Sequence, residues 1–246
     1  MADLEQALAQ VVGDAEPERL ARVTGQLIDR YQADRPAAPG QPIMAGAIEA
    51  RAYAAYRMPA TYAAIRAVLD QLPDRDLDSH LDLAGGTGAA VWSVADRWPT
   101  VGQHTVFEQA PAAIELGRAL VAKADPAAVR QTRWRATVLT GELELPTSDV
   151  ITIGYLLSEI EDPLQRQVIA AAARAADQFL IIVEPGTKKG YRRIIAARDQ
   201  LLAAGMHIIA PCPHQLDCPL QEQDQDWCHF SARVNRSALR FTRAEK

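Results

Sequence analysis

Residues 79–88 read SHLDLAGGTG, a short strand-like run that turns on three glycines. The pattern predicts a strand that ends at Leu83 and a helix that begins at Ala89. Glycine permits positive φ angles and lets a ligand approach the backbone without meeting a Cβ atom. The first turn of the helix offers free N–H groups to an electronegative ligand. The stretch therefore predicts a ligand-binding loop between a strand and a helix.

The chain after this loop repeats the same alternation of strand and helix. Further strands are predicted at 105–107, 134–138, 149–154 and 179–183, and helices at 88–97, 110–124, 164–176 and 191–204. Strands separated by helices at this rhythm predict an α/β fold, with a Rossmann-like parallel sheet and helices on both of its faces.

The two ends of the sequence differ from this pattern. Residues 1–75 are rich in alanine and carry apolar residues at helical spacing, which predicts an N-terminal helical region with a break at 34–42. Residues 76–246 form the predicted second domain. Within it, residues 211–229 are rich in Pro, Cys and His without periodicity, so we expect an irregular insertion before a last strand at 228–234.

The charge balance limits the classes of partner. The 246-residue chain has a net charge of −5, which argues against a protein that coats nucleic acid by bulk electrostatics. From residue 186 onward, however, ten Lys and Arg stand against six Asp and Glu, a surplus of four positive charges. This asymmetry is compatible with a local nucleic-acid face, and equally with basic side chains that solvate helix surfaces.

Composition also indicates the compartment. The longest apolar runs are too short to cross a bilayer, so no membrane partner is expected. The N-terminus lacks the basic and apolar regions of a secretory signal, and three cysteines are few for a disulfide framework. We therefore expect a cytoplasmic protein.

The spacing within the glycine loop discriminates between nucleotide ligands. A dinucleotide loop requires Gly-x-Gly-x-x-Gly/Ala, but the third position here is Val91, which disfavours an NAD-dependent oxidoreductase. The Gly-Lys-Ser/Thr of a Walker loop does not occur. The loop instead resembles the first motif of class I methyltransferases. That resemblance implies an S-adenosylmethionine site in which Asp82 helps to hold the cationic methionine end, while Gly85, Gly86 and Gly88 pass under the ribose.

An acidic residue ends the next predicted strand. Glu108 follows the run Thr105–Phe107, twenty residues after Gly88. A carboxylate at the tip of a second strand can accept hydrogen bonds from both hydroxyls of a ribose. Glu108 is therefore the predicted ribose ligand, and the alternative is a structural glycine turn beside an exposed strand-end charge.

The predicted fourth strand exits into Tyr155-Leu-Leu-Ser-Glu159. Tyr155, Ser158 and Glu159 are placed to face a substrate there, or alternatively to pack against the next helix. Methyltransferases that act on amino groups of DNA carry an Asn/Asp-Pro-Pro-aromatic motif at this point, and this sequence does not. The residues therefore identify no catalytic base, and we expect no DNA partner.

All three cysteines lie within seventeen residues, at Cys212, Cys218 and Cys228. A loop of this composition buries little apolar surface, so a metal would supply the missing cross-link. Three thiolates with His214 or His229 suit a Cys₃His zinc site. Three thiolates with another fourth ligand suit an iron–sulfur cluster. The alternative is three reduced cysteines in a proline-rich loop.

Taken together, these stretches resemble the ribosomal small-subunit methyltransferase-like family, which comprises mitochondrial small-subunit assembly factors and their bacterial relatives. The most specific strings are VEPGTKKG at 183–190, PCPH at 211–214 and WCHF at 227–230. The resemblance implies a cofactor-binding domain that engages small-subunit ribosomal RNA, or a pre-ribosomal particle. In mitochondrial members the matching cysteines belong to a four-iron (4Fe-4S) cluster, which uses four cysteines where this sequence has three.

Clustered basic residues support an RNA partner, because lysines and arginines at such density neutralise phosphates. They are Lys188, Lys189, Arg192, Arg193, Arg198, Arg233, Arg236, Arg240 and Arg243. The leading hypothesis is an S-adenosylmethionine-dependent methyltransferase, or methyltransferase-like factor, acting on the small ribosomal subunit. Its rival is a non-catalytic RNA-binding assembly factor with a metal-stapled loop.

Overall fold

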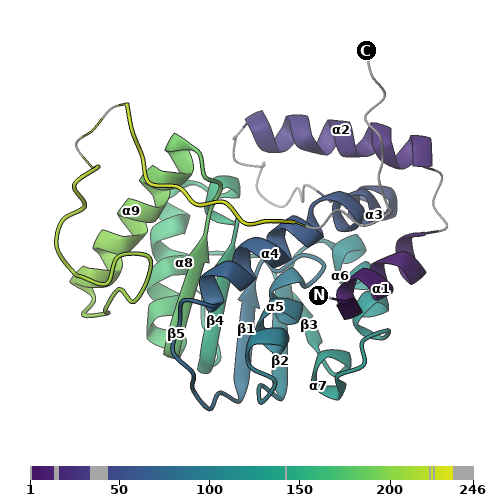
Figure 1. The fold of residues 1–246 in the computed structure, drawn as a ribbon, viewed down its shortest axis with the longest axis horizontal. Coiled ribbons are helices and arrows are strands. Elements are labelled where there is room, and N and C mark those ends of the chain that lie inside the picture. The colour runs from purple at the N-terminus through teal and green to yellow at the C-terminus, as the bar shows by residue number, and fades with distance from the viewer. Residues whose placement is uncertain are drawn as a thin grey trace.

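The structure is a computed structural model that describes residues 2–13, 17–33, 44–141, 143–221, 223 and 225–234. Its centre is a five-stranded sheet in the order β3-β2-β1-β4-β5, in which every neighbouring pair is parallel (Figure 1). The strands are β1 (Ser79–Leu83), β2 (Gln103–Glu108), β3 (Arg133–Ala136), β4 (Ser148–Gly154) and β5 (Ala176–Val183). The predicted α/β class with a parallel sheet is confirmed.

Helices cover both faces of the sheet. One face packs through Leu81, Leu83, Ile151 and Ile153 against α8 (Asp162–Ala175) and α9 (Lys188–Ala203). The opposite face carries α4 (Met58–Leu69) and α5 (Ala89–Arg97), which pack on Val150 of β4 and on β5. The remaining α-helices are α1 (Ala2–Val12), α2 (Pro17–Ala33), α3 (Ala47–Tyr56), α6 (Pro111–Val121) and α7 (Ala127–Arg130), and a short 3-10 helix, η1, spans Leu157–Glu159.

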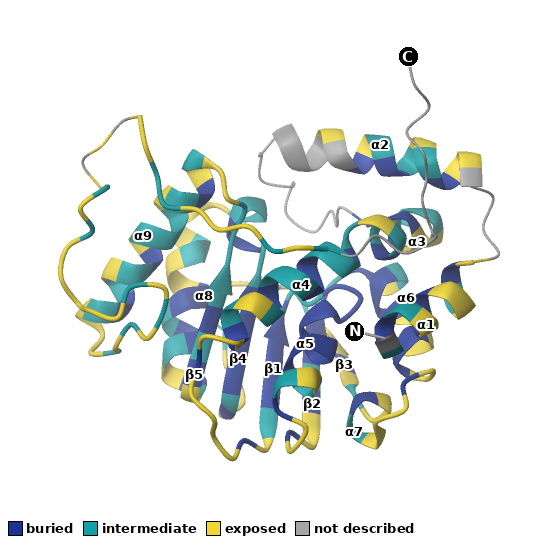
Figure 2. Cartoon of the chain, viewed as in Figure 1, coloured by how far each residue is buried: buried dark blue, intermediate teal, exposed yellow. Residues whose placement is uncertain are grey.

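The central strands are buried along almost their whole length, as Figure 2 shows for β1 and β4. Strands buried on both faces of a parallel sheet usually read as continuous apolar runs. Here His80 and Asp82 of β1 and Thr152 of β4 interrupt the apolar pattern, although each is at most 2% exposed. The sheet therefore contains buried polar groups that need partners inside the protein.

The region predicted to be helical contains α1 to α4, and its predicted break at 34–42 lies outside the described residues. Helix α4 does not stand apart from the sheet domain. Ile65 and Leu69 of α4 are buried in one cluster with Val94 of α5 and Phe179 of β5. The described part of the N-terminal region thus shares a core with the sheet.

The predicted last strand at 228–234 is wrong, because these residues are irregular in the structure. The segment after α9 does not run beside β5. It follows the outer side of α9 and then crosses over the molecule toward α4 and α3 (Figure 1). Phe230 is 70% exposed there, so this stretch lacks the alternating burial that holds a strand in register.

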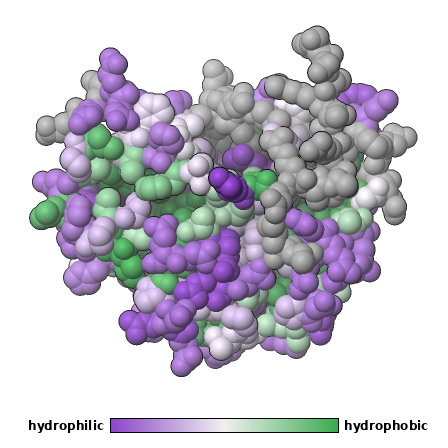
Figure 3. All heavy atoms as spheres, in the orientation of Figure 1, coloured by the Kyte–Doolittle hydropathy of each residue, from purple (hydrophilic) through white to green (hydrophobic). Residues whose placement is uncertain are grey.

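None of the helices in the described part of the chain is long and apolar enough to cross a membrane. On the face seen in Figure 3, apolar side chains are interspersed with hydrophilic ones.

Candidate cofactor-binding site

The glycine loop turns tightly between β1 and α5, at the carboxyl edge of the sheet. Ala84, Gly86 and Gly88 have φ angles of 54°, 56° and 89°, in the left-handed region. Gly85 is required for a second reason, since a Cβ atom there would lie 2.2 Å from Oδ2 of Asp82 and 2.7 Å from Cγ1 of Val106. The backbone at Gly85 therefore packs directly against the Asp82 carboxylate, and any side chain at position 85 would prevent this contact.

Glu108, at the end of β2, holds this loop in place. Its Oε2 accepts a hydrogen bond from the N–H of Gly86 at 2.8 Å, and its Oε1 accepts one from the N–H of Ala110 at 2.8 Å. The side chain is buried, and this burial raises the pKa of Glu108 while the backbone donors partly oppose the rise. The backbone of Gln109 is a third donor to this carboxylate, and a carboxylate accepts about four hydrogen bonds, so capacity is left for a ribose hydroxyl.

Asp82 lies beside Glu108, at the tip of the adjacent strand. The two predicted acidic ligands are thereby brought together with Gly85, Gly86 and the loop backbone. Asp82 is 2% exposed, and its Oδ1 accepts a hydrogen bond from the Thr152 hydroxyl at 2.6 Å. Burial raises the pKa of Asp82 to about 7, with the Thr152 hydrogen bond opposing the rise and the Glu108 charge adding to it. Such a carboxylate gains most from a cationic neighbour.

Trp134 of β3 contacts the glycine loop, and the sequence pattern did not predict this role. Its indole N–H donates a hydrogen bond to the Gly86 carbonyl at 3.2 Å. Its ring lies so close to α6 that a Cβ atom at Gly117 would be 2.6 Å from it, and one at Gly88 would be 3.1 Å from it. A buried tryptophan usually finds a partner for its N–H, but the sequence does not specify which carbonyl supplies it.

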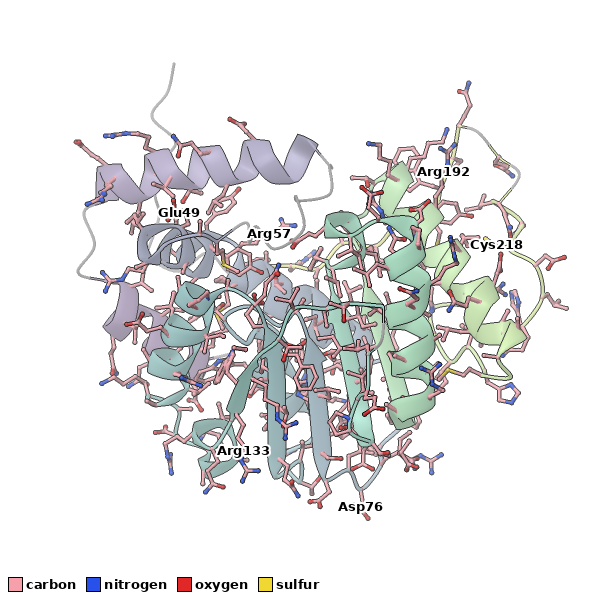
Figure 4. All side chains as sticks on the ribbon, turned by 180° about the vertical axis from the view of Figure 1, so that it is seen from behind. Glu49, Arg57, Asp76, Arg133, Arg192 and Cys218 are labelled. Carbon is pink, nitrogen blue, oxygen red and sulfur yellow. The ribbon has the colours of Figure 1, made fainter. Side chains whose placement is uncertain are left out.

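The N-terminal helical region forms a roof over the loop. The Thr87 hydroxyl donates a hydrogen bond to the Met58 sulfur at 3.3 Å, and the Met44 methyl would lie 3.4 Å from a Cβ atom at Gly86. Figure 4 shows Arg57, at the junction of α3 and α4, above the carboxyl edge of the sheet, with Asp76 at the opposite edge. The site is therefore built from both predicted regions.

The exit of β4 adds further functional groups to this edge. Tyr155 has a φ of 62°, a strained conformation for a residue with a side chain, and the guanidinium of Arg57 lies 5.2 Å from its ring centre. Burial raises the pKa of Glu159 to about 8, and the charges of Glu108 and Glu184 add to the rise. The edge thus gathers buried carboxylates with raised pKa values, Glu108 and Glu159, an arrangement that favours a cationic ligand.

Figure 4 places Cys218 beside α9, at the side of the molecule away from Arg57. Trp227 and His229, which flank Cys228, lie against Gly186, just before α9. All three cysteines are free and half-buried. Burial raises the pKa of the Cys228 thiol, and the proximity of Cys212 and Cys218 adds to the rise, so the three thiols lie in one neighbourhood. The Cys218 sulfur is also 3.3 Å from the Tyr191 hydroxyl. Nevertheless, no three Cys, His, Asp or Glu side chains in the described ranges are arranged as a metal-ligand set.

Comparison with known proteins agrees with this architecture. A human mitochondrial protein, the ribosome assembly protein METTL17, is 25% identical over 187 residues, which cover 68% of this chain and 40% of that protein. The chain therefore spans about two fifths of this relative's length. An O-methyltransferase family protein from Burkholderia thailandensis has a TM-score of 0.52 at 18% identity, covering 69% of this chain and 54% of that one. That likeness establishes the Rossmann-like class I methyltransferase fold.

A precorrin-6y C5,15-methyltransferase from Geobacter metallireducens is also similar, with a TM-score of 0.43, 18% identity, and coverage of 55% of this chain and 69% of that one. The model of one family, described as mitochondrial small ribosomal subunit Rsm22, matches residues 47–246. This range includes the glycine loop, Glu108 and the three cysteines. The protein therefore belongs to the Rsm22 family.

Proposed function

We propose that this protein binds S-adenosylmethionine at the carboxyl edge of its sheet and acts as a methyltransferase, or methyltransferase-like factor, on the small ribosomal subunit. The observation that carries the proposal is the juxtaposition of Asp82, Glu108 and the glycine loop. Glu108 is bonded to the loop through Gly86, and Asp82 lies against the position of Gly85. In this arrangement Glu108 would bind the ribose hydroxyls, and Asp82 would orient the methionine end.

Electrostatics support a sulfonium nucleoside rather than a neutral or anionic one. Asp82, Glu108 and Glu159 all have raised pKa values at this edge, chiefly because they are buried. An anionic phosphate would meet like charges there, whereas a sulfonium or ammonium group would relieve them. The predominance of carboxylates therefore favours adenosylmethionine over a dinucleotide.

Small-subunit RNA, or a pre-ribosomal particle, is the proposed partner. The human relative is named as a ribosome assembly protein. In this chain the basic residues of 188–198 belong to α9, where Lys189 and Arg192 are exposed. Exposed cations on one helix can contact phosphates, and such binding weakens as salt rises. Arg236, Arg240 and Arg243 of the predicted basic set lie outside the described residues.

A non-catalytic assembly factor is the second candidate, and one observation favours it. The exit of β4 reads Gly154-Tyr-Leu-Leu157 in place of the Asn/Asp-Pro-Pro-aromatic motif. Without that motif, catalysis would depend on orienting the methyl group against an RNA nucleophile. Methyl transfer from labelled cofactor to small-subunit RNA separates the two candidates: transfer supports an enzyme, and binding without transfer supports a scaffold.

Calorimetry tests the cofactor itself. We expect adenosylmethionine to bind with a Kd on the order of micromolar, about −8 kcal/mol, and NAD to give no response. The Gly88→Arg variant should lose binding, because a Cβ atom at position 88 would already lie 3.1 Å from the Trp134 ring, and the rest of the arginine side chain would displace the loop. Binding of NAD instead would overturn the proposal.

A metal at the cysteine segment remains part of the proposal. The three thiols share one neighbourhood and supply three of the four ligands of a zinc or 4Fe-4S site. His214, His229 or a partner would supply the fourth, and the metal would cross-link a segment that has little apolar core. Anaerobic purification with metal analysis decides between them: a brown protein with iron and sulfide indicates a cluster, and a colourless one with one zinc indicates a zinc site.

A further inference from the structure

A continuous line of buried polar side chains crosses three strands and ends at Asp82. Nδ1 of His104 on β2 lies 3.1 Å from Nδ1 of His80 on β1. Nε2 of His80 lies 2.9 Å from the Thr152 hydroxyl on β4, which donates to Oδ1 of Asp82 at 2.6 Å. All four side chains are at most 2% exposed. The strand register sets the line, because His80 pairs with His104 and Asp82 pairs with Thr152.

The number of hydrogens available along this line determines in which direction its hydrogen bonds are donated. An ionised Asp82 can only accept, so the single hydroxyl hydrogen of Thr152 points to it. Nε2 of His80 must then donate to Thr152, and Nδ1 of His80, in the neutral ring, must accept from Nδ1–H of His104. Burial lowers the pKa of His80 well below its ordinary value and that of His104 to about 4, so both rings are neutral near pH 7. With Asp82 ionised and both rings neutral, each histidine is restricted to one tautomer. In that tautomer the buried Nε2 of His104, which has no hydrogen-bond partner among the described residues, carries no hydrogen, and the Val101 carbonyl competes with His80 for the hydrogen of the His104 ring.

The Asp82 carboxylate connects this line to the cofactor site. Its Oδ1 is held by Thr152, and its Oδ2 is the atom that a Cβ at Gly85 would meet at 2.2 Å. The neighbouring charge of Glu108 opposes ionisation of Asp82, and the Thr152 hydrogen bond favours it. A chain of aligned donors strengthens the last bond to an anion, because each bond polarises the next.

We propose that Thr152, His80 and His104 are positioning residues that favour the ionised form of Asp82 and aim it at the cofactor, with every donor in the line directed toward it. This inference rests on the proposed function for the role of Asp82. The direction of the hydrogen bonds does not rest on it, because it follows from an ionised Asp82 and two neutral histidine rings. When Asp82 takes up a proton, the same atoms can reverse, so that its O–H donates to Thr152 and both histidines change tautomer.

Nitrogen NMR of the histidine rings tests the direction without an activity assay. In the full chain at a pH well above 7, we expect the hydrogen on Nε2 of His80 and on Nδ1 of His104. At a pH below the pKa of Asp82 but above that of His104, the two tautomers should exchange or broaden. Finding both rings in the opposite tautomer at high pH, or either ring cationic there, would overturn the inference even if adenosylmethionine binds.

A matched pair of variants tests the effect on the cofactor. Thr152→Val keeps the shape but removes the donor, so the pKa of Asp82 rises and adenosylmethionine should bind about tenfold more weakly near pH 7. The affinity should recover at higher pH, and Thr152→Ser should restore it near pH 7. If Thr152→Val binds as the parent does at every pH, the positioning role is wrong. Failure of the parent protein to bind would instead sink the proposed function and leave the NMR result standing.

Discussion

At the scale of single residues, Gly85 is the position where the site tolerates least change. A Cβ atom there would meet the Asp82 carboxylate at 2.2 Å and the Val106 side chain at 2.7 Å, both from buried residues. We expect Gly85→Ala to lose about 2 kcal/mol in free energy of unfolding through overpacking, and to abolish cofactor binding. Gly102→Ala is the control, since its nearest neighbour would be 3.8 Å away. Urea denaturation and calorimetry measure both effects, and equal behaviour of the two variants would contradict the prediction.

The raised pKa values of Asp82 and Glu159, about 7 and about 8, make cofactor binding depend on pH. A cation binds the ionised carboxylates, so the affinity for adenosylmethionine should rise as pH increases through this range and release protons on binding. The stability of the protein without cofactor should change with pH in the opposite direction to the cofactor affinity. The folded protein holds these protons to higher pH than the unfolded chain, so these two groups lower stability as pH rises from about 4 to about 8. Calorimetry in buffers of different ionisation enthalpy counts the protons, and a pH-independent affinity would contradict the assignment.

At the scale of elements, β3 serves the site through Trp134 although it forms one edge of the described sheet. Trp134→Phe keeps a ring but removes the N–H that bonds the Gly86 carbonyl. We expect a loss of about 1 kcal/mol in unfolding free energy, and weaker cofactor binding because the loop is less restrained. Trp227→Phe is a matched control: its indole N–H also bonds a glycine carbonyl, that of Gly186 at 3.1 Å, outside this site. A similar loss of cofactor affinity in both variants would argue against a specific role for Trp134.

At the scale of the whole molecule, the N-terminal helices and the sheet behave as one core. Ile65 and Leu69 of α4 pack with Val94 of α5 and Val150 of β4, and all four are at most 2% exposed. We therefore expect the fragment 76–246, which follows the boundary predicted from sequence, to lack cooperative unfolding. It would expose the apolar face that α4 covers and the glycine loop beneath Met58. Near-ultraviolet circular dichroism during thermal unfolding tests this, and a sharp transition in the fragment would show that the boundary separates independent domains.

The sequence by itself determined the features that depend on short-range patterns. The alternation of strands and helices follows from the spacing of apolar residues. The loop at Gly85–Gly88 follows from its glycines, because glycine is the residue that tight turns with positive φ angles favour. The juxtaposition of Asp82 and Glu108 was also predictable, because residues at the carboxyl ends of neighbouring parallel strands meet at one edge. The sequence pattern failed at 228–234, where apolar residues mark a surface-crossing segment rather than a strand.

Only the tertiary structure decided which distant residues complete the site. The hydrogen bond from Trp134 to the loop, the contact of Met58 of α4 with Thr87, and the line from His104 to Asp82 all join residues separated by more than twenty positions. Their positions depend on strand order and register, which place His80 against His104 and Asp82 against Thr152. No local periodicity encodes such pairings, because they result from the global packing of buried groups that must find partners away from water.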